Sequence, residues 1–190
     1  MCYIELLVNM FNFHNETHEY ILFIDTEFDQ QELVQFCGLL FRQIDGSNYV
    51  PYRSLNVYIQ LPVTAGFTRY TNISSKFLEH NGVTLEDARW QINECLLKDV
   101  GKNILLVSHG LHSDLTVLAK NHISLPHAAE FCTFEKAKTI LHRFTQLSLD
   151  DLAKEAAIYP AIEHNAYIDA WLTVGVYNYL KDIEEKDELC

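Results

Sequence analysis

Two carboxylates one residue apart, Asp25 and Glu27, follow an apolar run at residues 20–24. An uninterrupted apolar run of this length is typical of a strand that is covered on both faces. Side chains alternate along a strand, so the two acids point the same way. Two like charges at the end of a buried strand are costly unless a cation compensates them, and oxygen ligands suit a divalent metal ion. An exposed acidic strand end is the alternative interpretation of this pair taken alone.

Two further acids and a histidine stand in comparable places. Asp114 follows the apolar residues 104–107 by one short turn, at the edge of a sheet where ligands bind in open α/β folds. As a first-turn helix residue it could equally favour the helix dipole. Asp169 lies inside an apolar helical pattern, where an unpaired charge would be costly. His164, in the loop before that helix, could fold back over the same site or lie on the surface.

The elements that must position these residues follow from the apolar periodicity. Strands are predicted at residues 20–28, 33–42, 50–60, 103–107 and 129–133, with a hairpin signal at Asp45-Gly46. Helices are predicted from the cap Thr84 to about Leu96, from Ser113 or Asp114, and over residues 134–142, 149–157 and 165–181, whereas residues 67–82 are mixed. This order predicts an α/β fold with a mixed sheet of three antiparallel strands followed by parallel strands, flanked by helices.

The chain has 190 residues, enough for one domain with a sizeable core. We expect an N-terminal extension at residues 1–19, the main domain at 20–181 and an acidic tail at 182–190. The apolar runs are too short to span a bilayer, and residues 1–10 lack the features of a signal peptide. Five scattered cysteines without paired spacing favour a reducing compartment, so a cytoplasmic protein with no membrane partner is expected.

The charge is strongly negative. Fourteen basic and 26 acidic residues give a net charge of −12. Proteins that grip long nucleic acids by their phosphates are usually basic, so this balance counts against tight non-specific binding. It does not exclude a metal-dependent enzyme, because bound ions supply positive charge locally.

Three segments together resemble a known family. The stretch Phe23-Ile24-Asp25-Thr26-Glu27-Phe28 resembles motif I of the DEDDh-type 3′→5′ exonucleases, the DnaQ-like members of the ribonuclease H-like superfamily. Residues 106–110 leading to Asp114 resemble motif II, and residues 164–170 resemble motif III. The likeness covers roughly residues 20–180. Gly110 stands where the family usually has Asn, and Ser113 where it usually has Phe, which puts the seating of the terminal nucleotide in question.

The resemblance implies a ribonuclease H-like fold and roles for individual residues. Two Mg²⁺ or Mn²⁺ ions would activate the attacking water and stabilise the phosphoryl charge. By the resemblance, Asp25 bridges both ions, Glu27 and Asp169 complete the ion on the nucleophile side, and Asp114 serves the other. His164 would be the general base. The candidates for substrate binding are Thr26, Phe28 and His109, although Phe28 could simply pack in the core.

The sequence therefore predicts a metal-dependent 3′→5′ exonuclease that acts on the 3′ end of single-stranded nucleic acid and releases nucleoside monophosphates. DNA and RNA both remain open as substrates, and a polymerase or another protein partner could supply processivity. One alternative is a catalytically silent module of the same fold that binds nucleic acid or a polymerase. Another is an oligoribonuclease-like enzyme that acts on dinucleotides, which an acidic surface would tolerate better than long polymers.

Overall fold

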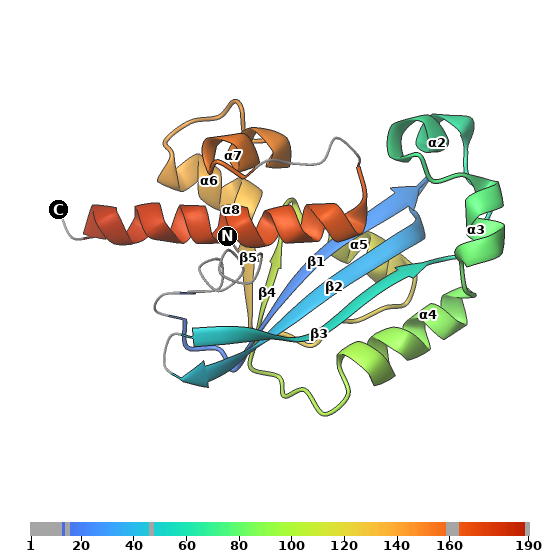
Figure 1. The fold of residues 1–190 in the computed structure, drawn as a ribbon, viewed down its shortest axis with the longest axis horizontal. Helices are drawn as coiled ribbons and strands as arrows, with labels where there is room; N and C mark the ends of the chain where they lie inside the picture. The colour runs from blue at the N-terminus through green and yellow to red at the C-terminus, as the bar shows by residue number, and fades with distance from the viewer. Residues whose placement is uncertain (1–12, 14–15, 46–47, 159–163, 189–190) are drawn as a thin grey trace, which may run out of the picture.

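A five-stranded mixed sheet forms the centre of the molecule (Figure 1). The computed structural model describes residue 13 and residues 16–45, 48–158 and 164–188. The strand order is β3-β2-β1-β4-β5, with β1 in the middle. The strands are β1 (Tyr20–Asp29), β2 (Glu32–Asp45), β3 (Asn48–Tyr58), β4 (Ile104–Ser108) and β5 (Ala129–Cys132). The pairs β1–β2 and β2–β3 are antiparallel, whereas β1–β4 and β4–β5 are parallel, which confirms the predicted α/β architecture.

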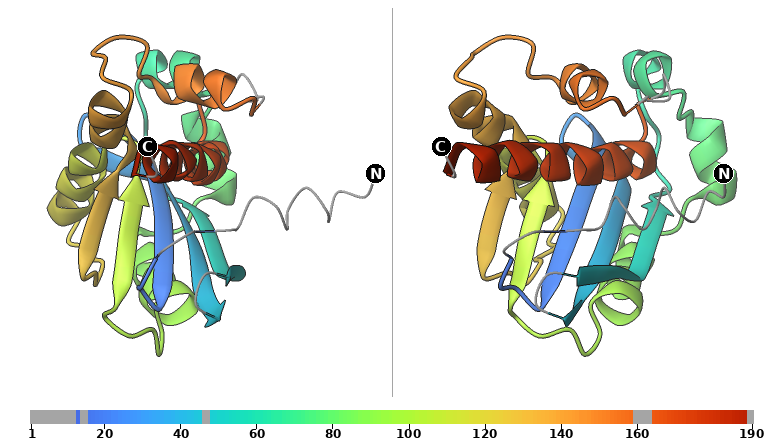
Figure 2. Two further views of the ribbon diagram at one scale, coloured as in Figure 1. Left: turned by 90° about the vertical axis from the view of Figure 1, so that its left-hand side faces the viewer. Right: turned by 60° about the vertical axis from the view of Figure 1, so that its left-hand side comes forward.

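Helices cover both faces of this sheet (Figure 2). They are α2 (Ala65–Thr71), α3 (Ser75–Asn81), α4 (Leu85–Gln91) with its π-helical continuation η1 (Ile92–Leu96), α5 (Leu111–Lys120), α6 (Thr133–Ile140), α7 (Leu149–Glu155) and α8 (Ala166–Glu188). Alternation along β1 divides its apolar side chains between two cores. Ile21 and Phe23 pack on the side of α6, α7 and α8, and Leu22 and Ile24 pack on the side of α4 and α5.

The helix boundaries differ from the sequence predictions at three places. The helix that carries Asp114 begins at Leu111, because Gly110 takes a left-handed conformation with φ of 90° and forms its N-cap. The segment that seemed mixed contains α2 and α3, each capped by a hydroxyl side chain, Thr64 and Ser74. The predicted cap Thr84 is confirmed, and Ser148 caps α7 at the predicted start of that helix.

The last helix is longer than predicted. Helix α8 continues to Glu188 rather than ending at Lys181, so most of the expected acidic tail is helical. The ammonium group of Lys181 lies 3.0 Å from the carboxylate of Glu184 one turn on and 3.7 Å from that of Glu16. These contacts offset part of the charge repulsion that a run of acids brings to a helix end.

The described part of the N-terminal extension packs on the main domain. Phe13 is fully buried, and its ring centroid lies 5.7 Å from that of Phe23 and 5.3 Å from that of Tyr49. The hydroxyl of Tyr177 on α8 donates to the Glu16 carboxylate at 2.6 Å. Residues 1–12 and 14–15 of the predicted extension lie outside the described residues.

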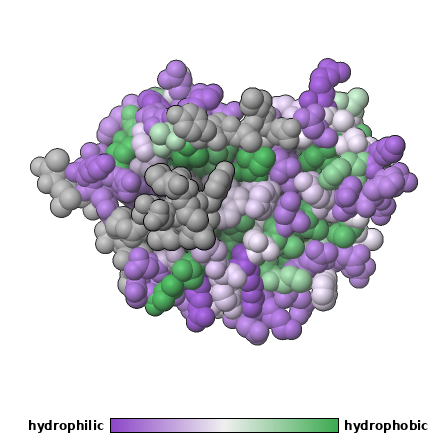
Figure 3. Space-filling model, in the orientation of Figure 1, coloured by the Kyte–Doolittle hydropathy of each residue, from purple (hydrophilic) through white to green (hydrophobic). Residues whose placement is uncertain are grey.

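The surface is mixed in character. On the face shown in Figure 3, apolar side chains lie scattered among hydrophilic ones. Within the described ranges, no helix combines the length and the apolar character that crossing a lipid bilayer requires.

Candidate active site

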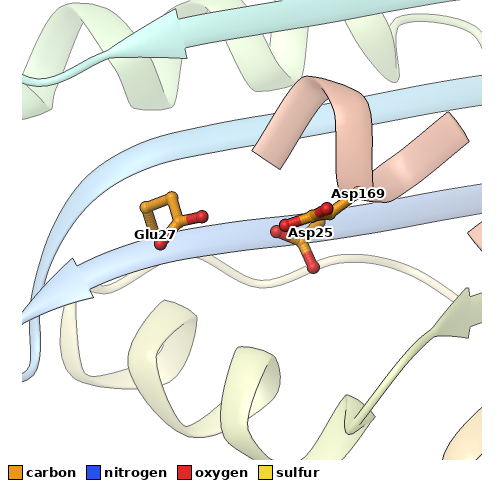
Figure 4. A group of neighbouring side chains, drawn as sticks. All are labelled: Asp25, Glu27 and Asp169. Atoms are coloured by element: carbon orange, nitrogen blue, oxygen red, sulfur yellow. The ribbon is translucent and has the colours of Figure 1, made fainter. Parts of the chain in front are cut away.

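Three carboxylates meet above the carboxyl end of β1. Oxygen atoms of Asp25, Glu27 and Asp169 lie within 4.8 Å of one another, and all three side chains are partly buried. Figure 4 shows the first two rising from β1 and Asp169 reaching toward Asp25 from the first turn of α8. Since Asp25 and Glu27 are two residues apart on a strand, they share one face of the sheet. The donor set consists of hard oxygen ligands, which fits Mg²⁺ or Mn²⁺.

A buried amide places the start of α8 over these acids. Gln35 on β2 is the register partner of Glu27 and is fully buried. Its Oε1 accepts the backbone N–H of Ala166 at 3.2 Å, and its Nε2 donates to Oδ1 of Asn165 at the same distance. Asn165 Oδ1 also accepts the N–H of Tyr167 at 3.0 Å. One side chain of β2 thus accepts the first backbone N–H of the helix that carries Asp169 and also holds Asn165, which precedes it.

Gln35 is a site residue that was not predicted from the sequence. A lone amide inside the apolar stretch at residues 33–41 was the available signal, because a buried amide demands specific partners. The β1–β2 ladder also shifts register between Glu27 and Phe28, skipping Val34. Such bulges are common beside active sites, where they end regular pairing and change the direction of the side chains that follow.

Burial raises the pKa of each acid in this group. Burial raises the pKa of Asp25 well above its usual range, and the charges of Asp114, Asp169 and Glu27 raise it further. Burial, together with the other acids, raises the pKa of Glu27 to about 7, and burial raises that of Asp169 to about 6. Without a cation this group therefore retains protons near neutral pH, and a divalent ion would favour the fully ionised state.

Asp114 lies near the three carboxylates but is not one of the acids whose oxygens meet within 4.8 Å. Its Oδ1 accepts the hydroxyl of Thr26 at 2.7 Å, and its Oδ2 accepts the hydroxyl of Ser108 at 2.5 Å. Burial raises the pKa of Asp114 to about 6, although these hydroxyls oppose the shift. Thr26 is buried because it points to the face opposite Asp25. In this structure its side chain therefore holds Asp114, and neither its predicted contact with substrate nor the metal role of Asp114 is seen directly.

His164 stacks on an aromatic ring that the sequence analysis did not single out. Its ring centroid lies 4.0 Å from that of Tyr70 in α2, with 17° between the planes. His164 is half-buried, and its charge lowers the pKa of Asp169, against the larger effect of burial. The structure therefore brings His164 to the side of the acidic group that Asp169 occupies. No local pattern in residues 65–71 marks Tyr70, because its partner is distant in sequence.

The two remaining candidates lie at the margins of the site. Phe28, at the end of β1, is 39% exposed. His109 is half-buried, and its Nδ1 shares a hydrogen bond with the hydroxyl of Thr133 at 2.9 Å. Burial lowers the pKa of His109 to about 4, so it is neutral at physiological pH. Phe28 is therefore open to a stacking partner, whereas one ring nitrogen of His109 is already engaged.

Comparison with known proteins places this geometry in context. No model of a protein family matches the chain, and no curated protein matches it. Solved structures do match. Exonuclease X, in complex with 5′-overhanging duplex DNA, aligns with a TM-score of 0.61 at 17% identity over 85% of this chain and 91% of its own. The chain therefore shares the fold of this exonuclease, a ribonuclease H-like mixed sheet flanked by helices.

Two other structures share this exonuclease fold. Exonuclease I of E. coli, in complex with a dT13 oligonucleotide, gives a TM-score of 0.68 at 13% identity, over 88% of this chain but 42% of its own. A 3′-exonuclease that recognises the 3′ end of a histone mRNA stem-loop gives a TM-score of 0.68 at 14% identity, over 94% of this chain and 69% of its own. This chain thus spans less than half the length of Exonuclease I.

Proposed function

We propose that this chain is a metal-dependent 3′→5′ exonuclease that hydrolyses the terminal phosphodiester bond of single-stranded nucleic acid and releases a nucleoside monophosphate. The observation that carries the proposal is the group formed by Asp25, Glu27 and Asp169, whose oxygens lie within 4.8 Å of one another. It occurs in a fold shared with exonucleases whose structures contain DNA or recognise RNA ends.

Asp25, Glu27 and Asp169 would hold the divalent ions. When bound, Mg²⁺ or Mn²⁺ would activate the attacking water and stabilise charge on the phosphoryl oxygens. Asp114 would serve the second ion. The hydroxyls of Ser108 and Thr26 would keep that carboxylate ionised and oriented.

His164 would take the proton of the attacking water at a ring nitrogen, because imidazole changes charge near neutral pH. Its position beside Asp169 supports this role. Phe28 is exposed enough to stack on the terminal base. Thr26 would assist with its backbone groups, because its hydroxyl is engaged with Asp114. His109, whose ring is hydrogen-bonded to Thr133 and to the backbone of Leu147, would contact substrate through the face or edge of its ring.

The charge balance bears on the substrate. A net charge of −12 opposes tight binding of long polymers, so a polymerase or another protein partner would deliver long ends. The same observation favours dinucleotides as the second candidate substrate. The three described cysteines, Cys37, Cys95 and Cys132, are free thiols, which suits a cytoplasmic location.

Hydrolysis of end-labelled substrates tests the proposal. Single-stranded DNA, single-stranded RNA and dinucleotides, labelled at either end, are incubated with Mn²⁺ and the wild-type protein. We expect stepwise loss of nucleoside monophosphates from the 3′ end, and no activity in Asp25→Asn. Glu79→Gln, which alters an exposed acid on α3, is the matched control and should act like wild type. Absence of metal-dependent hydrolysis on every substrate would contradict the proposal and favour a silent binding module.

A further inference from the structure

The strongest unassigned feature beside the acidic group is the stacked pair of Tyr70 and His164. The two ring centroids are 4.0 Å apart and the planes are nearly parallel. Among the described residues, no hydrogen bond to the His164 ring is present, and the stacking on Tyr70 is its aromatic contact. Tyr70 itself is 63% exposed, so its stacking on His164 takes place at the surface of the protein.

Tyr70 lies on helix α2, which is hydrogen-bonded to the end of strand β1. The N-cap residue of α2, Thr64, donates its hydroxyl to the Asp29 carboxylate at 3.1 Å, and its backbone N–H donates to the same carboxylate. Asp29 is the last residue of β1, two positions after Glu27. Buried Phe67 packs α2 against Val34 and Leu78. Helix α2 therefore fixes the Tyr70 ring relative to Asp25 and Glu27 on β1.

The surroundings of the Tyr70 hydroxyl agree with this placement. Burial raises the pKa of Tyr70, and the charges of Glu27 and Asp169 raise it further. The phenol therefore stays neutral, and it lies within electrostatic reach of the acidic group. A neutral aromatic face beside an imidazole restricts the ring without competing for a proton.

We propose that Tyr70 is a positioning residue that holds the His164 ring in the orientation needed to accept a proton from the attacking water. The proposal rests on the proposed function, in which His164 is the general base. A base must lie within hydrogen-bond reach of its proton, and a displacement of about 1 Å can cost about a hundredfold in rate. The His164 ring stacks on Tyr70 of α2, and the start of α8, which Gln35 holds, follows His164 directly in the chain. Both contacts restrict rotation of the His164 ring away from the acids.

Steady-state kinetics of matched variants test the role. Tyr70→Phe keeps the ring and should act like wild type, whereas Tyr70→Leu should lower kcat about tenfold to a hundredfold with little change in KM. The Phe144→Leu control removes another exposed aromatic ring, 86% exposed in the α6–α7 connection, and should leave kcat unchanged. In a His164→Gln background, Tyr70→Leu should cause no further loss, because the two residues act as one unit.

A second measurement reports the contact without any activity. The ring protons of His164, assigned by their loss in His164→Gln, lie over the tyrosine ring and should shift upfield in the NMR spectrum. Tyr70→Leu should move these signals downfield, whereas Tyr70→Phe and Phe144→Leu should not. Unmoved signals in Tyr70→Leu overturn the proposal.

The kinetic outcomes separate this inference from the proposed function. If wild type is active and Tyr70→Leu is unimpaired, the positioning role is wrong and the exonuclease function stands. If Tyr70→Leu raises KM and its effect persists in the His164→Gln background, Tyr70 binds substrate instead, which also overturns the positioning role. An inactive wild type overturns the proposed function and the positioning role with it.

Discussion

Replacing Glu27 with Gln should make the metal-free protein more stable at pH 8 while weakening its stabilisation by metal. The pKa of Glu27 is raised from 4.5 to about 7, chiefly by burial. The folded state therefore holds this proton more tightly than the unfolded state between these two values. The stability that the protonated form provides is present in full below pH 4.5 and is lost as the pH rises through 7.

The size of the effect follows from the shift. One pKa unit corresponds to about 1.4 kcal/mol, so the shift of Glu27 sets an upper bound of about 3 kcal/mol at pH 8. Partial exposure and coupling to the other acids reduce this, and we expect a gain of about 1–3 kcal/mol for Glu27→Gln. For a domain of this size, each kcal/mol moves the melting temperature by about 2–4 °C. At pH 4 the variant and wild type should melt together.

Thermal unfolding followed by circular dichroism, with EDTA or with Mn²⁺, measures both effects. Wild type should gain about 3 kcal/mol from Mn²⁺ at a hundred times its dissociation constant. Glu27→Gln should gain much less, because a carboxylate ligand is missing. The exposed-acid control Glu79→Gln should behave like wild type in both buffers. A metal-free Glu27→Gln that melts below wild type at pH 8, or a wild type indifferent to Mn²⁺, would refute the assignment of this group as a cation site.

Three further predictions concern the residues around the acids. His164→Gln should lower kcat by about 10²–10⁴ while keeping the thermal stabilisation by Mn²⁺, and loss of that stabilisation would count against the general-base role. Gln35→Ala leaves the buried N–H of Ala166 without its acceptor. Urea unfolding should show that the free energy of unfolding falls by about 1–3 kcal/mol. The stabilisation by Mn²⁺ should also weaken, because Asp169 shifts with the start of α8. Phe13→Ala removes a fully buried ring and should lower the free energy of unfolding by about 3–5 kcal/mol in the same assay. A loss under about 1 kcal/mol would show that Phe13 does not pack on the main domain as described.

Much of the fold was predictable because its signals are local. The strands show apolar runs, the helices Leu85–Gln91 and Leu149–Glu155 begin at hydroxyl caps, and the hairpin after Asp45 has its turn signal. Helices α2 and α3, of seven residues each, were not predicted, although each begins at a hydroxyl cap, Thr64 and Ser74. The C-terminal end of α8 was not predicted, because the contact of Lys181 with Glu16 joins parts of the chain that are distant in sequence.

The candidate site divides in the same way. The sequence by itself determined that Asp25 and Glu27 share a face, since the period of a strand is fixed by backbone geometry. It also marked Asp169 as an acid that needs a partner. Only the tertiary structure decided that Asp169 joins the pair within 4.8 Å, whereas Asp114 binds two hydroxyls beside it.

The same holds for the residues that orient the site. Gln35 and Ala166 are 131 positions apart, and Tyr70 meets His164 across a comparable stretch of chain. Such contacts leave no periodic trace, because they depend on where whole elements pack rather than on the spacing of neighbours. The sequence thus determined which groups could bind a cation, and the packing of α2 and α8 on the sheet decided which of them meet.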